Sequence, residues 1–190
     1  MDLLLATNNS HKADEIRAML SDRFGRIYTL KEKKIDLSPD ENGATFTENA
    51  LIKARAFSAL TDLPVLADDS GLVVEALGGE PGIRSARYAG ENSTDADNNA
   101  KLMMRLEGVK DRRARFECRV VLLFNGKYLV GTGTTEGEIL SAPSGVLGFG
   151  YDPYFYSYDL KKSFATASPA EKNSVSHRGR AIKDLLQQRF

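Results

Sequence analysis

Cysteine and histidine are scarce in this chain of 190 residues. Cys118 is the only cysteine, and there are two histidines. A single cysteine cannot form an intrachain disulfide, which fits a reducing compartment, so we expect a cytoplasmic protein. The Cys-x-x-Cys and His-Glu-x-x-His patterns that bind zinc are absent, and the two histidines lie far apart. These absences argue against a disulfide framework and against a zinc centre.

The chain also lacks a net charge and a long apolar segment. Lysine plus arginine equals aspartate plus glutamate, 26 each. Coating nucleic acid requires a basic excess, so we expect no nucleic-acid partner, whereas a small anionic ligand needs only a local basic cluster. The longest apolar run, Val120–Phe124, is far too short to span a membrane, and the first residues lack the basic start of a signal peptide. We expect no membrane association.

The remaining composition and periodicity indicate a globular α/β protein. Hydrophobic residues make up 42%, and 190 residues suit a single domain over 1–190. The patterns predict strands over 3–6, 35–37, 65–67, 72–76, 115–124, 127–131 and 154–156, and helices over 11–24, 45–60, 94–107 and 176–189. A capping box is predicted at Thr45–Glu48, Thr94 with Asp97 is predicted to start a helix, and Asn125-Gly126 predicts a type I′ hairpin turn.

Three cationic side chains fall on the apolar faces of their predicted helices. Lys12 is four residues before Ile16, Lys53 lies beside its apolar stripe, and Arg178 is four residues before Ile182. Each side chain could simply extend over apolar surface to reach water. Arg178 also opposes the dipole of its helix, so it requires a carboxylate or a ligand as an acceptor. Three converging cations would suit a polyanion.

The segment Thr7–Lys12 follows an apolar strand and opens a helix. Free amides at a helix N-terminus suit phosphate, and the side chains here add further donors. An ordinary turn capped by Asn9 or Ser10 explains the segment equally well. The Walker pattern and the dinucleotide Gly-x-Gly-x-x-Gly pattern are both absent.

The segment Leu66–Gly71 reads LADDSG, with Asp68 and Asp69 at a predicted strand end. Together with Glu41, these carboxylates would make a magnesium site, because magnesium prefers one or two carboxylates plus waters and phosphates. Adjacent strand residues point to opposite faces, so one aspartate can face a ligand while the other makes a structural bond. A simple turn is the alternative interpretation.

Two later segments carry aromatic and cationic residues. In Gly148–Pro153, Phe149 could stack on a base, although a tight turn with core aromatics is an alternative. In Glu171–Arg178, predicted to open the last helix, Lys172, His177 and Arg178 could donate to a purine 6-oxo group, which only accepts hydrogen bonds. A solvated, charged helix start is the alternative there.

Taken together, these motifs resemble those of the inosine triphosphatase family, which includes the dITP/XTP pyrophosphatases. The resemblance covers nearly the whole chain and rests on residues 3–16, 41–54, 67–90, 148–153 and 171–181. It implies an elongated mixed β-sheet flanked by helices, with two lobes around a central nucleotide cleft. It also implies magnesium-dependent hydrolysis of ITP, dITP and XTP to the monophosphate and pyrophosphate, by a homodimer.

The resemblance assigns roles to particular residues. Asp69 would be the catalytic base, and Glu41 and Asp69 would bind magnesium. The phosphate and substrate residues would be Thr7, Asn8, Asn9, Ser10, His11, Lys12, Lys53 and Ser70. The base would be held by Phe149, Gly150, Tyr151, Asp152, Lys172, His177 and Arg178.

The chain departs from the family pattern at three positions. Val146 and Leu147 stand where glycines are common, and Thr166 stands near a position that is often acidic. None of the three is a predicted catalytic residue. A non-catalytic nucleotide-binding module and a pyrophosphatase for modified pyrimidine nucleotides are the rival classes. The carboxylates argue against the first, and the cations of Glu171–Arg178 argue against the second.

Overall fold

A computed structural model of the chain describes residues 1–188. Its strands are β1 (Leu3–Leu5), β2 (Ile27–Thr29), β3 (Val65–Val74), β4 (Arg113–Phe124), β5 (Lys127–Ile139), β6 (Phe155–Ser157) and β7 (Lys162–Ser163). Its α-helices are α1 (Ser10–Leu20), α2 (Phe46–Ser58), α3 (Asp95–Arg105), α4 (Pro169–Val175) and α5 (His177–Leu186). Within the described residues, no helix combines the length and apolar character needed to cross a bilayer.

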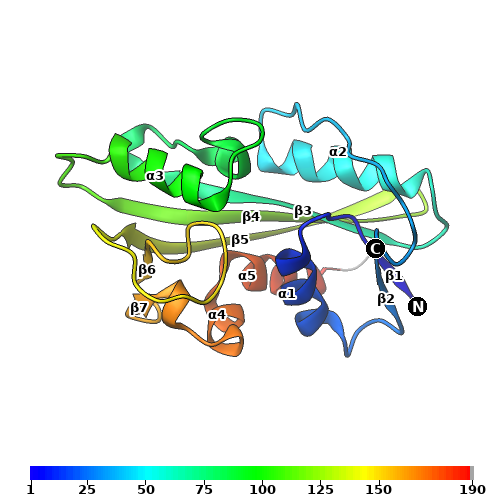
Figure 1. Cartoon of the computed structure of the whole chain (residues 1–190). Helices are drawn as coiled ribbons and strands as arrows, with labels where there is room; N and C mark the ends of the chain where they lie inside the picture. Colours follow the sequence, from blue (N-terminus) through cyan, green and yellow to red (C-terminus); the bar gives the residue numbers. More distant parts are fainter. Residues whose placement is uncertain (189–190) are drawn as a thin grey trace. The chain divides into compact units, whose positions relative to one another are not determined.

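The strands belong to one mixed sheet with the order β2-β1-β3-β4-β5-β6-β7 (Figure 1). Strand β1 runs parallel to both β2 and β3, whereas β6 runs antiparallel to β5 and β7. Helices alternate with strands in the first part of the chain and return at its end. The predicted α/β class, with a mixed sheet flanked by helices, is therefore confirmed.

The chain divides into two compact units. The first comprises residues 1–69, residues 118–133 and the chain from 178 onward, and the second comprises 70–117 and 134–177. Strands β3, β4 and β5 continue from one unit into the other, so neither unit is contiguous in sequence. The single domain over 1–190 and the nucleotide cleft both stay predictions.

In the first unit, alternate residues of β1 face two different helix layers. Leu3 and Leu5 pack with α1 and α5, through residues that include Ile16 and Ile182. Leu4 packs with α2 instead. Because successive strand residues point to opposite faces, α1 and α5 cover one face of this part of the sheet and α2 covers the other, as Figure 1 shows.

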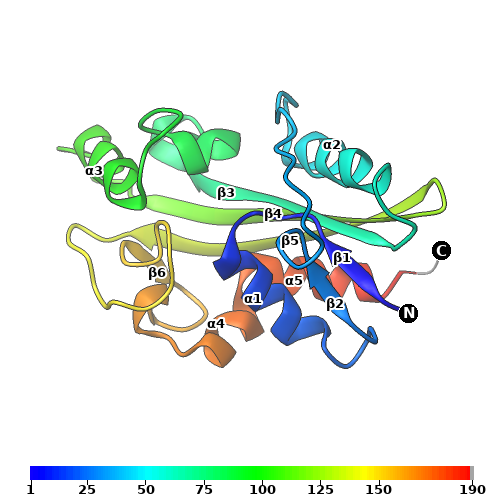
Figure 2. The same ribbon diagram turned by 45° about the vertical axis from the view of Figure 1, so that its right-hand side comes forward.

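The second unit has its own core around three phenylalanine rings. The ring centroids of Phe116 and Phe155 lie 4.6 Å apart, and those of Phe155 and Phe164 lie 5.0 Å apart. Helix α3 contributes Leu102 to this core, and Figure 2 shows α3 and α4 on opposite sides of the sheet in this unit. Tyr151 belongs to the same core, which anchors the Gly148–Pro153 segment, of sequence GFGYDP, to this unit.

Two local sequence signals give the structures predicted from them. Asn125 and Gly126 have φ values of 51° and 74°, as a type I′ turn requires, and they join β4 to β5. Thr94 and Asp97 form a reciprocal capping box at the start of α3. The φ preferences of two residues decide the first feature and short-range hydrogen bonds decide the second, so the local sequence was sufficient to predict both.

The segment Leu66–Gly71 lies inside a strand, contrary to the prediction. We predicted separate strands over 65–67 and 72–76, but β3 runs without a break from Val65 to Val74, and all its residues except Ser70 are buried. Asp, Ser and Gly favour turns in isolation. Here the aspartates are paired with cations from the covering helices, so the strand can continue through them.

The last helix is shorter than predicted and follows a separate helix. Residues 171–175 belong to α4, which Ser168 caps through a capping box. Ser176 has an extended backbone and ends α4, and α5 begins at His177. The charged segment Glu171–Arg178 therefore spans two helices rather than opening one. The predicted helix end at Arg189 lies outside the described residues.

Two further predictions near the N-terminus are corrected. The strand predicted over 35–37 is not formed, and β2 at Ile27–Thr29 pairs with β1 instead. The capping box at Thr45–Glu48 is half formed. Thr45 accepts from the Glu48 N–H, but the Glu48 carboxylate accepts from the N–H of Ala44, one residue earlier.

Candidate functional site

The two adjacent aspartates of β3 meet different helix layers. Leu66 belongs to the face covered by α1 and α5, and Ala67 belongs to the face covered by α2. Strand alternation places Asp68 on the face of Leu66 and Asp69 on the face of Ala67. The separate partners of the two carboxylates agree with the sequence-based expectation that both need not reach one site.

Asp68 is the centre of an ion cluster on the face covered by α1 and α5. Its Oδ2 lies 3.0 Å from Lys12 Nζ and 3.2 Å from Arg178 Nη2. The side chains of Asp68 and Arg178 are each only 1% exposed. Burial raises the pKa of Asp68, but the charges of Lys12, Arg178 and Lys53 outweigh burial and hold that pKa well below the usual range. Asp68 therefore stays ionised as the counter-ion of two helices.

Arg178 finds the carboxylate acceptors that its helix position requires. It is the second residue of α5, where a cation opposes the helix dipole. Its Nη1 donates to Glu15, and its Nε and Nη2 donate to Asp68. Burial lowers the pKa of Arg178, but the two carboxylates outweigh burial and raise it. The carboxylate alternative for this residue is therefore what the structure shows.

Asp69 belongs to a second cluster, on the face covered by α2. Asn49 Nδ2 donates to Asp69 Oδ2 at 3.1 Å. Lys53 Nζ donates to Glu41 Oε2 at 2.8 Å and lies 3.7 Å from Asp69 Oδ1. Asn49 and Lys53 are four residues apart in α2, so they share one face of that helix. The cluster brings the predicted catalytic residue together with a predicted phosphate-binding lysine and the other predicted metal ligand.

The surroundings shift the pKa values of this second cluster. Burial raises the pKa of Asp69, and the neighbouring charge of Glu41 raises it further, although Lys53 and Lys12 act in the opposite direction. Burial lowers the pKa of Lys53, but the surrounding carboxylates Asp69, Asp68 and Glu41 outweigh burial and raise it. Lys53 thus stays a cation, and Asp69 is a stronger base than an exposed aspartate.

Glu41 and Asp69 suit a hard divalent cation. Both carboxylates contact the Lys53 ammonium, so this position already accepts positive charge. Across residues 1–188, no group of three or more His, Cys, Asp and Glu side chains is arranged to hold a metal ion. Two carboxylates with waters and substrate phosphates are a common magnesium environment. The donor set fits magnesium shared with a phosphate ligand rather than a closed protein cage.

The Thr7–Lys12 segment forms the turn between β1 and α1. Asn9 caps α1, because its Oδ1 accepts from the Lys12 N–H at 3.1 Å. Thr7 Oγ1 accepts from the Asn9 N–H at 3.2 Å. Residues 8–11 are exposed. The capped-turn alternative is therefore confirmed, and the phosphate-binding role stays a prediction.

In the second unit, the GFGYDP segment folds around the carboxylate of Asp152. Its Oδ2 accepts from the Phe149 N–H at 2.9 Å and from Lys172 Nζ at 2.6 Å. The Lys172 ammonium also lies 4.6 Å from the centroid of the Phe149 ring. Gly148 has a φ of 77°, and a Cβ there would lie 2.1 Å from Asp152 Oδ2. Three predicted substrate residues are thus in mutual contact, and Gly148 gives the carboxylate room.

The other predicted substrate residues of this unit also make contacts within it. The Tyr151 hydroxyl donates to the carbonyl of Ser85 at 2.8 Å. His177 is buried, and its ring stacks on Phe116 with centroids 4.7 Å apart. Ser70 is half-buried in β3. These contacts fix positions without testing the predicted ligand roles.

The predicted site residues therefore fall into two groups, one in each unit. The first unit holds Thr7, Asn8, Asn9, Ser10, His11, Lys12, Glu41, Lys53, Asp69 and Arg178, and the second holds Ser70, Phe149, Gly150, Tyr151, Asp152, Lys172 and His177. Sequence reasoning missed Glu15 and Asn49. Both had a helical-spacing signal, since Glu15 is three residues after Lys12 and Asn49 is four residues before Lys53.

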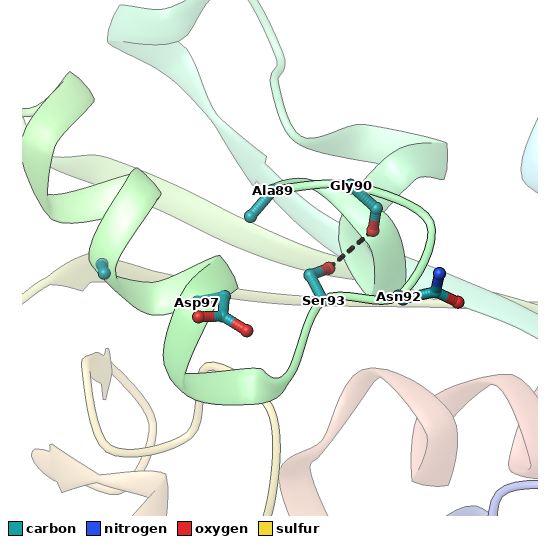
Figure 3. A pocket seen from close by; sticks show the side chains of 6 residues that line it. Ala89, Gly90, Asn92, Ser93 and Asp97 are labelled. Atoms are coloured by element: carbon teal, nitrogen blue, oxygen red, sulfur yellow. Dashed lines mark hydrogen bonds between the residues drawn. The ribbon is translucent and has the colours of Figure 1, made fainter.

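A pocket of about 470 Å³ in the second unit contains none of these residues (Figure 3). It is lined by Ala89, Gly90, Asn92, Ser93, Asp97 and Ala100. The Ser93 hydroxyl donates to the carbonyl of Gly90, as Figure 3 shows, and the Asp97 carboxylate completes the capping box of α3 by accepting from the N–H of Thr94. Local structure accounts for these polar groups, so the chemistry is better assigned to the carboxylate clusters.

The Ham1 family model matches residues 3–188. The chain is 46% identical to the dITP/XTP pyrophosphatase of Clostridium perfringens (strain 13 / Type A), over 96% of this chain and 94% of that protein. It is 49% identical to the dITP/XTP pyrophosphatase of Lactiplantibacillus plantarum (strain ATCC BAA-793 / NCIMB 8826 / WCFS1), over 97% of this chain and 92% of that protein.

A solved structure shows the same likeness. The HAM1 protein from Coxiella burnetii superposes with a TM-score of 0.87 at 42% identity, and the match covers 98% of this chain and 97% of that one. The resemblance inferred from the motifs is thus confirmed over nearly the whole length of the chain. The chain belongs to the Ham1 family.

Proposed function

We propose that this protein hydrolyses dITP, ITP and XTP to the nucleoside monophosphate and pyrophosphate. Relatives named dITP/XTP pyrophosphatase match nearly the whole chain. The single observation that carries the proposal is the Asp69 cluster. There, a buried carboxylate with a raised pKa lies beside a lysine and a second carboxylate. Buried acids with a shifted pKa and specific charged partners are common in active sites.

In the proposed reaction, the oxygen of a water attacks the α-phosphorus and forms a new P–O bond. The bond from the α-phosphorus to the oxygen that bridges to the β-phosphorus breaks, and pyrophosphate leaves with the electron pair. Asp69 orients the water and accepts its proton. The ammonium groups of Lys12 and Lys53 stabilise the phosphate charge, as fixed cations do in a buried site.

In this proposal, Glu41 and Asp69 would hold a magnesium ion. When bound, magnesium supplies neutralisation of phosphate charge and a lower pKa for a coordinated water. Lys53 contacts both carboxylates in this structure. We therefore propose that the Lys53 ammonium leaves them and turns to the substrate phosphates on binding.

Base selectivity is proposed to depend on Phe149, Lys172, His177 and Arg178. A purine 6-oxo group accepts hydrogen bonds from cationic donors, whereas the 6-amino group of adenine opposes a donor with a donor. The contact of the Lys172 ammonium with the Phe149 ring supports a combined stacking and donor platform. Arg178 already donates hydrogen bonds to two carboxylates. To recognise the base as well, its guanidinium must donate to the carboxylates and to the base at the same time.

A non-catalytic nucleotide-binding protein is the second class of function considered. Such a protein would need the phosphate and base residues but not an acid with a raised pKa beside a second carboxylate. The Asp69 cluster therefore favours the enzyme. The homodimer implied by the family resemblance and the cytoplasmic location expected from the single cysteine are part of the same proposal.

Asp69→Asn tests the catalytic assignment. The amide keeps the size of the side chain but cannot accept the proton, so turnover of dITP should fall by about 100-fold or more, while dITP still binds. Turnover is measured by pyrophosphate release, and binding by calorimetry with the inactive variant. Asp62→Asn, at an exposed position, is the matched control. Near-wild-type turnover of the Asp69 variant would refute the role of Asp69.

A further inference from the structure

The first turns of α3 hold both peptide groups that flank Gly150. The Gly150 N–H donates to Asp95 Oδ2 at 2.6 Å, and the Gly150 carbonyl accepts from Asn99 Nδ2 at 2.8 Å. Asn99 Nδ2 also donates to the carbonyl of Asp95 at 2.8 Å, so the two holding residues are linked to each other. Asp95 and Asn99 are four residues apart and share one face of the helix.

These contacts act where the backbone itself is least constrained. Gly150 has a φ of 61°, and a Cβ added there would meet nothing within 4 Å. Glycine moves readily between backbone conformations, so local sterics do not fix this turn. A hydrogen bond to a carboxylate is stronger than a neutral one, and the Asn99 side chain is buried, with 8% of the residue exposed. The hydrogen bonds that fix the conformation of Gly150 therefore come from α3.

The residue before Gly150 is the aromatic platform proposed for the base. The Phe149 ring lies under the Lys172 ammonium, and the Phe149 N–H donates to Asp152. The N–H that donates to Asp95 belongs to the peptide group between Phe149 and Gly150. Rotation of that peptide would tilt the ring relative to Lys172, whose own position is fixed by Asp152.

We infer that Asp95 and Asn99 are positioning residues, which hold the Gly150 peptides so that the Phe149 ring and the Lys172 ammonium meet the purine base together. The inference rests on the proposed function. Neither residue touches the reacting phosphates in this account. Their loss should therefore weaken base-dependent binding and leave the chemical step intact.

The test uses Asn99→Leu and Asp95→Ala in the full-length enzyme. For both variants, the KM for dITP should rise about tenfold with kcat nearly unchanged, because one or two oriented hydrogen bonds are lost. The ratio of kcat/KM for dITP over dATP should fall by a similar factor. Asp95→Asn keeps an acceptor for the Gly150 N–H, so it should restore most of the KM and of the ratio.

Asp97→Ala is the matched control for a merely structural effect. Asp97 lies in the same first turn, where its carboxylate accepts hydrogen bonds from the N–H and the hydroxyl of Thr94. The hydrogen bond from the Gly150 N–H goes to Asp95 instead. This variant should lower the melting temperature about as much as Asp95→Ala does and leave the KM and the dITP-to-dATP ratio unchanged. Equal KM shifts in the Asp95 and Asp97 variants would overturn the inference.

The remaining outcomes separate this inference from the proposed function. In one outcome, the wild-type enzyme cleaves dITP while the Asn99 and Asp95 variants keep its KM and its dITP-to-dATP ratio of kcat/KM. That result would overturn the inference and leave the proposed function in place. A wild-type enzyme that cleaves neither dITP nor XTP overturns the proposed function, and the inference falls with it. A lower kcat at constant KM and constant ratio means loss of folded enzyme and also overturns the inference.

Discussion

At the residue scale, two adjacent aspartates have different surroundings and different expected roles. Asp68 is almost fully enclosed, and its cationic neighbours keep its pKa low. Asp69 has its pKa raised by burial and by the charge of Glu41. A low pKa suits a permanent counter-ion, and a raised pKa suits a group that accepts a proton. We therefore assign stability mainly to Asp68 and chemistry to Asp69.

The Asp68→Asn substitution should lower the free energy of unfolding by about 3–5 kcal/mol, because it leaves Lys12 and the buried Arg178 without their charged partner. Urea denaturation followed by circular dichroism measures the change. Asp62→Asn, on the surface of the same unit, should change stability by less than about 0.5 kcal/mol. A loss below about 1 kcal/mol for Asp68→Asn would contradict the buried-pair account.

The wild type and Asp68→Asn should also differ in how their stability depends on pH. The pKa of Asp68 is lower in the folded state, so below about pH 4 the unfolded chain binds a proton that the folded chain does not. Wild-type stability from this group is present above that pH and is lost as the pH falls. The stability of Asp68→Asn should decline less steeply between about pH 4 and pH 2. Parallel pH curves for the two proteins would exclude this contribution.

Gly148 should tolerate no side chain. A Cβ at Gly148 would lie 2.1 Å from Asp152 Oδ2, whereas a Cβ at Gly126, which also has a positive φ, would meet nothing within 4 Å. Gly126→Ala should cost about 1–2 kcal/mol for its backbone conformation alone. Gly148→Ala should cost more, because it also displaces the carboxylate that holds Lys172. Thermal denaturation measures both losses of stability. Equal losses for the two variants would show that Asp152 moves away from the added Cβ without a cost in stability.

At the element scale, α2 places Lys53 beside Asp69, where burial raises the pKa of Asp69 and the lysine charge partly offsets that rise. The charge of Lys53 lowers the pKa of Asp69. In Lys53→Met the pKa of Asp69 in the free enzyme should rise, so the acidic limb of the kcat/KM profile, which reports the free enzyme, should move to higher pH, in addition to any loss of phosphate binding. Arg55→Met, on the exposed opposite face of α2, should leave the limb in place. An unmoved limb in Lys53→Met would mean that Asp69 is not the base.

Elements defined by neighbouring residues alone were predictable from the sequence. The Asn125-Gly126 hairpin and the Thr94 cap needed only neighbouring residues. The continuous β3 strand was not predictable in this way, since its aspartates favour a turn until cations from three helices pair with them. Strand β2 depends on its parallel partner β1, which its own three residues do not reveal.

The candidate site was predictable to a similar degree. Helical spacing correctly placed Lys12, Lys53 and Arg178 on buried sides of their helices. The identity of their partners was harder to predict, since Arg178 and Glu15 are 163 residues apart in the chain. Spacing rules act within one element, whereas these pairs depend on how β3 is covered by helices from both ends of the sequence.

At the scale of the whole molecule, a neutral chain concentrates charge locally. In the first unit, the cations Lys12, Lys53 and Arg178 contact the carboxylates Glu15, Glu41, Asp68 and Asp69. Three positive charges against four negative charges give this group of side chains a net charge of −1. A triphosphate adds further negative charge, so its binding requires an additional cation, which magnesium would supply.

The most direct test of this account measures pyrophosphate and orthophosphate release from dITP, XTP, GTP and ATP, with magnesium and with EDTA. We expect pyrophosphate from dITP and XTP, little product from ATP, and loss of activity in EDTA that added magnesium restores. Orthophosphate as the first product would place cleavage at the γ-phosphorus and contradict the proposed mechanism. Full activity in EDTA would contradict the role given to Glu41 and Asp69 as magnesium ligands.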